Sequence, residues 1–183
     1  MVDLVGFLYS FRIMLSEADV KEGKLVEDIE EKILASLKAG GISYEVFEHE
    51  PVYTCRKMAE FLKTGEDHIA KSMVVKKSDG GYVLAVLPGH MRIDFGRLAA
   101  ATKSRSVSLA PREEAERIVG CSVGCVYPLG NVVNLETLFD EKLLRQEYVY
   151  FNPGSHTKSV KIDTMALVSL VKPTRAEFAQ FSH

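Results

Sequence analysis

The chain has 183 residues, of which 46% are hydrophobic, so a single compact domain with a buried core is expected. Its 23 Lys and Arg residues are balanced by 25 Asp and Glu residues, and the net charge of −2 excludes a general attraction to nucleic acid or acidic membranes. Any contact with RNA must therefore come from a local basic patch.

The most apolar stretch, residues 4–15, does not resemble a membrane span or a secretory signal. It is interrupted by Arg12 and is shorter than the roughly 20 residues that a spanning helix needs. Asp3 precedes it and Glu17 follows it, whereas a secretory signal begins with basic residues and ends at a small-residue cleavage site. We therefore expect a cytoplasmic protein without membrane contact, and an N-terminal extension of unknown role over residues 1–22.

The three cysteines and five histidines form no metal-binding pattern. The cysteine spacing contains no C-x2-C pair, and the sequence has no H-E-x-x-H motif. We expect no metal, and we expect the thiols to be buried or idle.

In chain order, the first clear element is a helix from Leu25, whose apolar residues recur at helical spacing until two glycines at 40–41 end it. A short strand follows at 43–47, and Thr54 is a candidate N-cap for a helix over 55–63.

Two β-rich runs, 70–77 and 81–87, are joined by a Ser-Asp-Gly turn that predicts a hairpin. The later elements expected in chain order are a helix from its cap Asp94 to Ala101, a strand at 107–109, a helix over 111–119, a strand at 132–135, a short helical piece before Arg145, strands at 148–151 and 159–162, and a helix that Asp163 or Thr164 caps and that ends before Pro173.

Helices inserted between strands that come partly as hairpins predict an α+β, or mixed α/β, single domain around one curved sheet. We expect this domain to span residues 23–173 and to be followed by a C-terminal tail over 174–183.

Lys71 has an unusual place in the predicted hairpin. A period of two puts it on the same strand face as Met73 and Val75. Its ammonium could simply extend to water while its stem packs on apolar neighbours. Beside a pocket, desolvation would instead favour an anion such as a nucleotide phosphate, or would lower its pKa so that the amine bonds a substrate hydroxyl or carbonyl. The spacing leaves these alternatives open.

Two loops rich in glycine and proline could present backbone N–H groups to a ligand. The first runs from Gly124 through Pro128 to Gly130, and the second runs from Asn152 to His156, whose imidazole could orient a water. Ordinary connections and a solvated hairpin tip explain the same residues, so neither motif is decisive alone.

Five motifs nevertheless occur together, in the order 49–54 (HEPVYT), 70–75 (AKSMVV), 84–89 (LAVLPG), 124–130 (GCVYPLG) and 151–156 (FNPGSH). In this combination, residues 43–171 resemble the YbaK-type aminoacyl-tRNA deacylases, which include free-standing editing proteins and the editing domain of bacterial prolyl-tRNA synthetases. The resemblance implies a mixed α/β domain with a strongly curved, barrel-like sheet surrounded by helices. It also implies hydrolysis of the ester that joins an amino acid to the 3′ end of tRNA, without metal or organic cofactor.

The same resemblance implies roles for individual residues. Lys71 falls on the family's functional lysine, which engages the terminal adenosine or its phosphate, and His156 falls with Gly154 on a glycine-containing loop that lines the same pocket. Our own mechanistic hypothesis is that His156 assists the attacking water. The residues implied to bind the substrate, in loops around one pocket or in the wall of its mouth, are Tyr53, Thr54, Gly124, Pro128, Gly154 and Ser155.

This chemistry requires little from the protein, because an aminoacyl ester is already activated and a positioned water with a stabilised oxyanion can suffice. An editing site acts as a second sieve, so we expect a small pocket for Ala, Cys or Ser on a non-cognate tRNA, with tRNA-Pro as one candidate. Basic residues concentrated between positions 56 and 105 could dock the acceptor stem, although a solvated surface explains them too. An aminoacyl-tRNA synthetase is a further candidate partner.

Two other classes of protein stay open. A module of the same fold could hold a tRNA end or a synthetase without hydrolysing anything. A thiol hydrolase could use Cys55 with a histidine such as His49, which would require a lowered thiol pKa and a direct contact between the cysteine and histidine side chains.

Overall fold

The computed structural model describes residues 22–181, beginning with the helix α2 (Glu22–Ala39). The predicted helical spacing is confirmed, because Ile29, Ile33 and Leu37 are buried on one side of α2. The chain leaves the helix through Gly41, whose φ of 66° is available to glycine at little cost. The extension expected before residue 22 lies outside the described residues.

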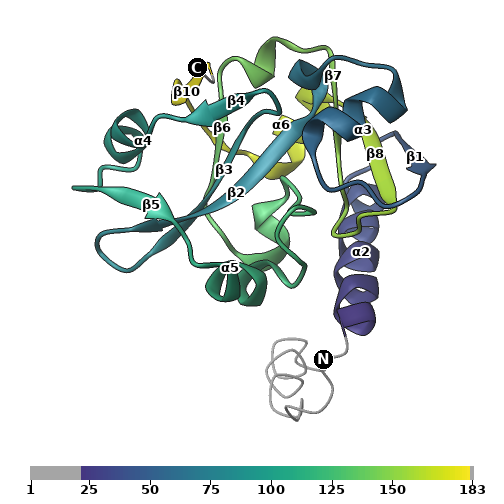
Figure 1. Cartoon of the computed structure of the whole chain (residues 1–183), viewed down its shortest axis with the longest axis horizontal. Coiled ribbons are helices and arrows are strands. Elements are labelled where there is room, and N and C mark those ends of the chain that lie inside the picture. Colours follow the sequence, from purple (N-terminus) through teal and green to yellow (C-terminus); the bar gives the residue numbers. More distant parts are fainter. Residues whose placement is uncertain (1–21, 182–183) are drawn as a thin grey trace, which may run out of the picture.

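The largest sheet has five strands in the order β5-β2-β3-β6-β9 (Figure 1). Their bounds are β2 (Ala70–Lys77), β3 (Tyr82–Pro88), β5 (Val107–Leu109), β6 (Thr137–Asp140) and β9 (Thr174–Ala176). The predicted hairpin is confirmed: β2 and β3 are antiparallel, and Lys71 lies opposite Leu87. β5 is antiparallel to β2, whereas β6 and β9 add parallel strands on the other side.

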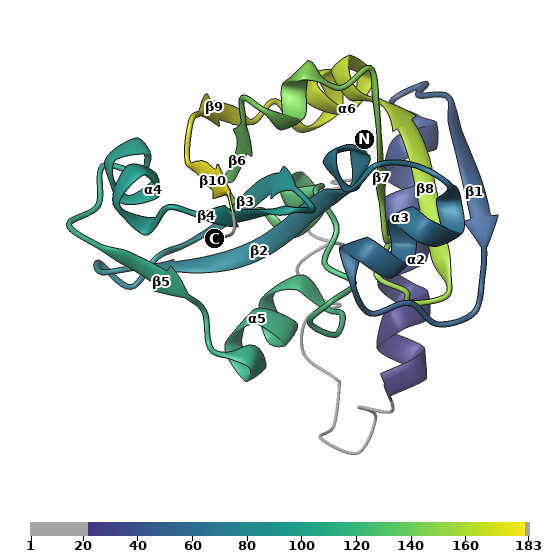
Figure 2. The same cartoon turned by 45° about the horizontal axis from the view of Figure 1, so that its top comes forward.

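Two smaller antiparallel sheets complete the strand pairing. The first has the order β1-β8-β7, and the second pairs β10 with β4. Their bounds are β1 (Tyr44–Glu48), β4 (Met91–Ile93), β7 (Tyr148–Phe151), β8 (Lys158–Asp163) and β10 (Ala179–Phe181). Figure 2 shows the three-stranded sheet and α2 at one end of the molecule and α4 (Phe95–Ala101) at the other.

The fold is mixed α+β in one domain, as predicted, but the expectation of one strongly curved, barrel-like sheet is wrong. The strands of residues 22–181 divide into three open sheets, and none of the three is closed or strongly curled. The five-stranded and three-stranded sheets approach each other at a single isolated bridge, Ile69 to Tyr150. Because no ladder continues through this bridge, hydrogen bonding does not join the sheets into one surface.

The other helices are α3 (Cys55–Leu62), α5 (Arg112–Val119) and α6 (Thr164–Val171), with short 3-10 turns η2 (Glu66–His68), η3 (Gly130–Val133) and η4 (Leu143–Arg145). Three predicted caps are confirmed: Thr54, Asp94 and Asp163 each accept a hydrogen bond from the backbone N–H three residues on. Within residues 22–181 no helix combines the length and apolarity needed to cross a bilayer.

The strand predicted at 132–135 is wrong. This segment contains the end of η3 and a turn at Asn134, whose φ of 55° lies in the left-handed region and cannot continue a strand. Gly130 also packs tightly here, because a Cβ on it would lie 2.1 Å from Thr137 Oγ1. The strand, β6, therefore begins only at Thr137.

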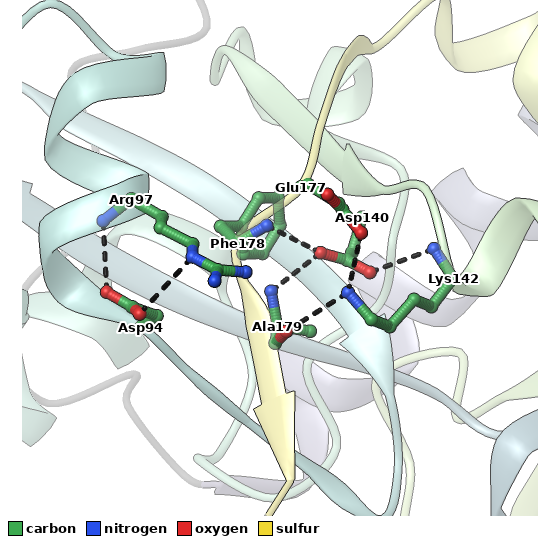
Figure 3. A network of polar contacts seen from close by, with 7 residues as sticks. All are labelled: Asp94, Arg97, Asp140, Lys142, Glu177, Phe178 and Ala179. Atoms are coloured by element: carbon green, nitrogen blue, oxygen red, sulfur yellow. Dashed lines mark hydrogen bonds and ion pairs between the residues drawn. The ribbon is translucent and has the colours of Figure 1, made fainter.

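The segment expected as a C-terminal tail contains β9 and β10 and is held by a buried carboxylate (Figure 3). Asp140 is 0% exposed, and its Oδ2 accepts hydrogen bonds of 2.7 Å from both Phe178 N and Ala179 N. Its Oδ1 accepts from Lys142 N at 2.9 Å. Phe178 itself is fully buried. These contacts attach β10 to the domain, beside β4.

Candidate active site

A cavity of about 410 Å³ opens where the start of β2 meets α3 and the loop between α5 and η3. Its walls are mostly apolar, with a few polar and charged groups. The residues that line it include Tyr53, Thr54, Cys55, Arg56, Glu66, Lys71, Gly89, Gly124 and Asn152. A pocket with an apolar wall and a few convergent polar groups is typical of a ligand site.

Lys71 is held in this cavity by two backbone carbonyls, one in the turn after β3 and the other at the first residue of β4. Its Nζ donates to Gly89 O at 3.0 Å and also to Met91 O. These contacts use two of the three N–H donors of an ammonium. Burial lowers the pKa of Lys71, and the nearby Arg92 acts in the same direction. Within residues 22–181 the ammonium makes no ion pair, so its charge is available to an anion in the cavity.

Gly124 brings a backbone amide to the cavity. Of the three amides at 123–125, Val123 N donates to Glu116 Oε1 and Cys125 N donates to Ser122 O, whereas Gly124 N has no partner within residues 22–181. Gly124 has a φ of 104°, and a Cβ on it would lie 3.1 Å from the His156 ring. A side chain at position 124 is therefore disfavoured by both the backbone and the packing.

His156 lies behind the cavity wall. Its Nδ1 is 3.1 Å from Val52 O, so Nδ1 carries the proton of the neutral ring and Nε2 is an acceptor. Its ring centroid lies 4.5 Å from that of Tyr53, which is 65% exposed at the mouth. His156 thus contacts two lining residues, Tyr53 and Gly124, but is not itself among the residues that line the cavity.

Three other residues of the predicted site do not line the cavity. Pro128 is buried, and Gly154 faces α2, because a Cβ on it would lie 2.6 Å from Ile29 Cγ2. Ser155 is also buried, and its Oγ accepts from Thr157 N at 3.2 Å. The structure therefore brings Lys71, Tyr53, Thr54 and Gly124 together and places Pro128, Gly154 and Ser155 where they shape the loops behind them.

Asn152 and Glu66 line the cavity, and neither was singled out from the sequence. Asn152 was quoted only as part of a motif, and Glu66 belongs to none of the five. Both amide N–H donors of Asn152 are used, by Ser155 O at 2.9 Å and Lys158 O at 2.8 Å. Glu66 begins η2 and is the only acidic residue among those lining the cavity in the described chain.

The contact required for a thiol hydrolase is not formed. Cys55 lines the cavity near Lys71, but burial raises the pKa of its thiol. Both ring nitrogens of His49 are engaged elsewhere, Nδ1 by Glu50 O and Nε2 by Ser159 Oγ, each at 2.8 Å. Nor does the described part of the chain gather three or more His, Cys, Asp or Glu side chains in an arrangement able to hold a metal ion.

The cavity thus contains an ammonium without an ion pair and a backbone N–H without an acceptor, both with respect to residues 22–181. Residues 49–170 match the family described as "Aminoacyl-tRNA editing domain". Because this match covers more than half of the chain, the chain belongs to the aminoacyl-tRNA editing domain family. The resemblance drawn from the five motifs is confirmed.

Curated relatives and a solved structure agree with this assignment. The chain is 28% identical over 152 residues to the "Multifunctional Ser/Thr-tRNA deacylase ProXp-y" of Escherichia coli (strain K12), covering 81% of this chain and 91% of the relative. It is 25% identical over 150 residues to the "Prolyl-tRNA editing protein ProX" of Acetoanaerobium sticklandii, covering 79% and 92%. The crystal structure of the hypothetical protein APE2540 aligns with a TM-score of 0.77 at 25% identity, covering 81% of this chain and 99% of that chain. Family members are aminoacyl-tRNA deacylases, and their substrate is therefore an aminoacyl-tRNA.

Proposed function

We propose that this protein is a trans-editing deacylase, which hydrolyses the ester of a small mischarged amino acid, Ala, Cys or Ser, on a non-cognate tRNA such as tRNA-Pro. The observation that carries the proposal is the state of Lys71: a partly buried ammonium inside a cavity, held by two carbonyls and without an ion pair to any residue between 22 and 181. A desolvated cation of this kind is stabilised when an anion enters beside it.

In the proposed mechanism, Lys71 anchors the terminal adenosine of the tRNA through its phosphate. The Gly124 N–H then donates a hydrogen bond to the ester carbonyl oxygen, on which negative charge develops as water attacks the carbon. The ester C–O bond breaks, and the ribose oxygen leaves with a proton from that water. His156 acts as a positioning residue, because its ring packs on Gly124 and Tyr53 while its Nδ1 is tied to Val52 O. The protein supplies orientation and charge stabilisation, and water supplies the nucleophile.

The proposal is tested by deacylation assays on tRNAs charged with Ala, Cys, Ser or Pro. We expect turnover of at least one small-residue ester, and a decrease in kcat/KM of roughly tenfold to a hundredfold in Lys71→Ala, since a hydrogen bond between charged groups contributes about 1.5–3 kcal/mol. Lys76→Ala is the matched control, because Lys76 is on the same strand but pairs with Glu114 at 2.9 Å, away from the cavity.

Each result separates the candidate classes. Unchanged turnover in Lys71→Ala, with the Lys76→Ala control also unchanged, would remove the anchoring role. If the wild type binds the tRNA but hydrolyses none of the four esters, the protein is instead a binding module. The urea unfolding midpoint of each variant shows whether a loss of activity reflects a loss of folding.

A further inference from the structure

Glu66 lines the same cavity as two basic residues. The other charged residues that line the cavity, Arg56 and Lys71, are both cationic. The backbone of Glu66 is tied to the turn that holds Lys71, because Glu66 O accepts from Gly89 N at 2.9 Å. The same oxygen accepts from Ile69 N at 3.2 Å, which closes the turn of η2. The carboxylate is therefore carried by a rigid turn.

This carboxylate is not neutralised by the protein. Within residues 22–181, Glu66 forms no ion pair, and its side chain accepts no hydrogen bond. It lies close enough to Lys71 and Cys55 to oppose the lowering of the Lys71 pKa by burial and to add to the raising of the Cys55 pKa by burial. It is partly buried, so a cation brought beside it would be less screened than at the open surface.

An aminoacyl ester carries a cation of its own, because the α-ammonium stands one carbon away from the reacting carbonyl. We propose that the Glu66 carboxylate binds the α-ammonium of the aminoacyl group, while Lys71 holds the phosphate end of the same substrate. This inference rests on the proposed function, and it names the group by which the aminoacyl moiety is oriented. Asn152 Oδ1, which accepts no hydrogen bond from residues 22–181, is an alternative acceptor, but a charge-assisted bond is about twice as strong as a neutral one.

The consequence is a requirement for a free amine. Acylation of the amine removes its positive charge and adds bulk, so an N-acylated aminoacyl-tRNA leaves the Glu66 carboxylate without its partner. The site then rejects peptidyl-type esters even when their side chain is small. This would be selectivity by charge, in addition to selectivity by size.

The experiment compares alanyl-, cysteinyl- and seryl-tRNA with their N-acetyl derivatives, using the wild type, Glu66→Gln and Asp67→Asn. We expect the wild type to prefer the free amine by about tenfold or more in kcat/KM. Glu66→Gln keeps the shape of the side chain and should lose most of this preference, with turnover of the N-acetyl esters unchanged within about twofold. Asp67→Asn removes the adjacent charge from the same turn, outside the cavity lining, and should retain the preference.

Binding of a stable analogue makes the test independent of hydrolysis. The probe is 3′-alanylamino-3′-deoxyadenosine 5′-phosphate, whose amide linkage replaces the ester, with its N-acetyl form as comparison. We expect calorimetry to give a Kd about tenfold lower for the free amine in the wild type, and equal Kd values in Glu66→Gln. The inference would be overturned if the wild type bound the two analogues with equal Kd values. It would also be overturned if Glu66→Gln lowered the affinity for both analogues by the same factor. If the wild type prefers the free-amine analogue but hydrolyses none of the aminoacyl-tRNA esters, the inference about Glu66 is supported and the proposed function is refuted.

Discussion

Asn152 connects the cavity to the loop behind it. It is 9% exposed, and its two N–H donors bond Ser155 O and Lys158 O, which fixes the orientation of the amide without ambiguity between its oxygen and nitrogen. The carbonyls that it holds lie on both sides of His156, the residue that packs on Gly124 and Tyr53. A single side chain thus sets the shape of the loop that supports the site.

We expect Asn152→Ala to lower the free energy of unfolding by about 2 kcal/mol, because two carbonyls lose their donor in a largely buried setting. Urea denaturation measures this change. The matched control is Asn131→Ala, since Asn131 is exposed and its loss should change stability by less than about 0.5 kcal/mol. Equal effects of the two substitutions would show that the Asn152 bonds contribute nothing specific.

The sequence predicted the residues of the site unevenly, for physical reasons. Lys71 and Gly124 stand in motifs, so the resemblance located them, although strand spacing alone had left the role of Lys71 open. The resemblance could not show that Gly154 faces α2, because this orientation depends on packing between segments that are distant in the sequence. Glu66 carries no motif signal, and it becomes part of the cavity only because η2 folds its backbone against Gly89.

Among the elements, β9 and β10 illustrate how one buried carboxylate can hold a short segment. Each strand has only three residues, too few for a periodic pattern to reveal it, and this is why the segment was expected to be a tail. By contrast, the β2–β3 hairpin and the three helix caps had strong local signals and were predicted correctly. Elements specified by neighbouring residues could therefore be predicted from the sequence, whereas the attachment of the last segment through Asp140 could not.

We expect Asp140→Ala to release β10 from β4, because the buried amides of Phe178 and Ala179 lose their acceptor. The cost to the free energy of unfolding should be about 3 kcal/mol. Hydrogen exchange should show faster exchange at Ala179 than in the wild type, while the amides of β3 remain protected.

The control for Asp140→Ala is Glu177→Gln in the same segment. This change removes only the charge of the 3.1 Å pair with Lys142, in which the Glu177 side chain is 58% exposed, so it should leave the free energy of unfolding almost unchanged. Unaltered exchange at Ala179 in Asp140→Ala would contradict the role assigned to the carboxylate.

At the scale of the whole molecule, α2 is joined to the site through a close contact with the 152–156 loop. Gly154 has a φ of 85°, and it approaches Ile29 so closely that no side chain fits between them. A Cβ at this position would also lie 3.6 Å from Cys121 Cβ. One glycine therefore determines how near the helix, the loop and the segment after α5 can pack.

We expect Gly154→Ala to destabilise the fold more than Gly80→Ala does. Both glycines have a positive φ, but nothing lies within 4 Å of a Cβ at Gly80, so that control costs only the conformational strain of about 1–2 kcal/mol. At Gly154 the clash with Ile29 should add about 1–3 kcal/mol, as measured by urea denaturation. If the two substitutions lowered the free energy of unfolding equally, α2 would be able to move away from the added methyl group at no energetic cost.

The pairing of Met91 with Phe181 has a consequence for the order in which the protein is made. Met91 supplies one of the carbonyls that hold the Lys71 ammonium, yet its strand partner is among the last described residues to leave the ribosome. A nascent chain can thus have synthesised all of the family-matched residues 49–170 while β4 is still an unpaired edge. We expect the Met91 carbonyl to reach its final place beside Lys71 only after residues 179–181 have been synthesised.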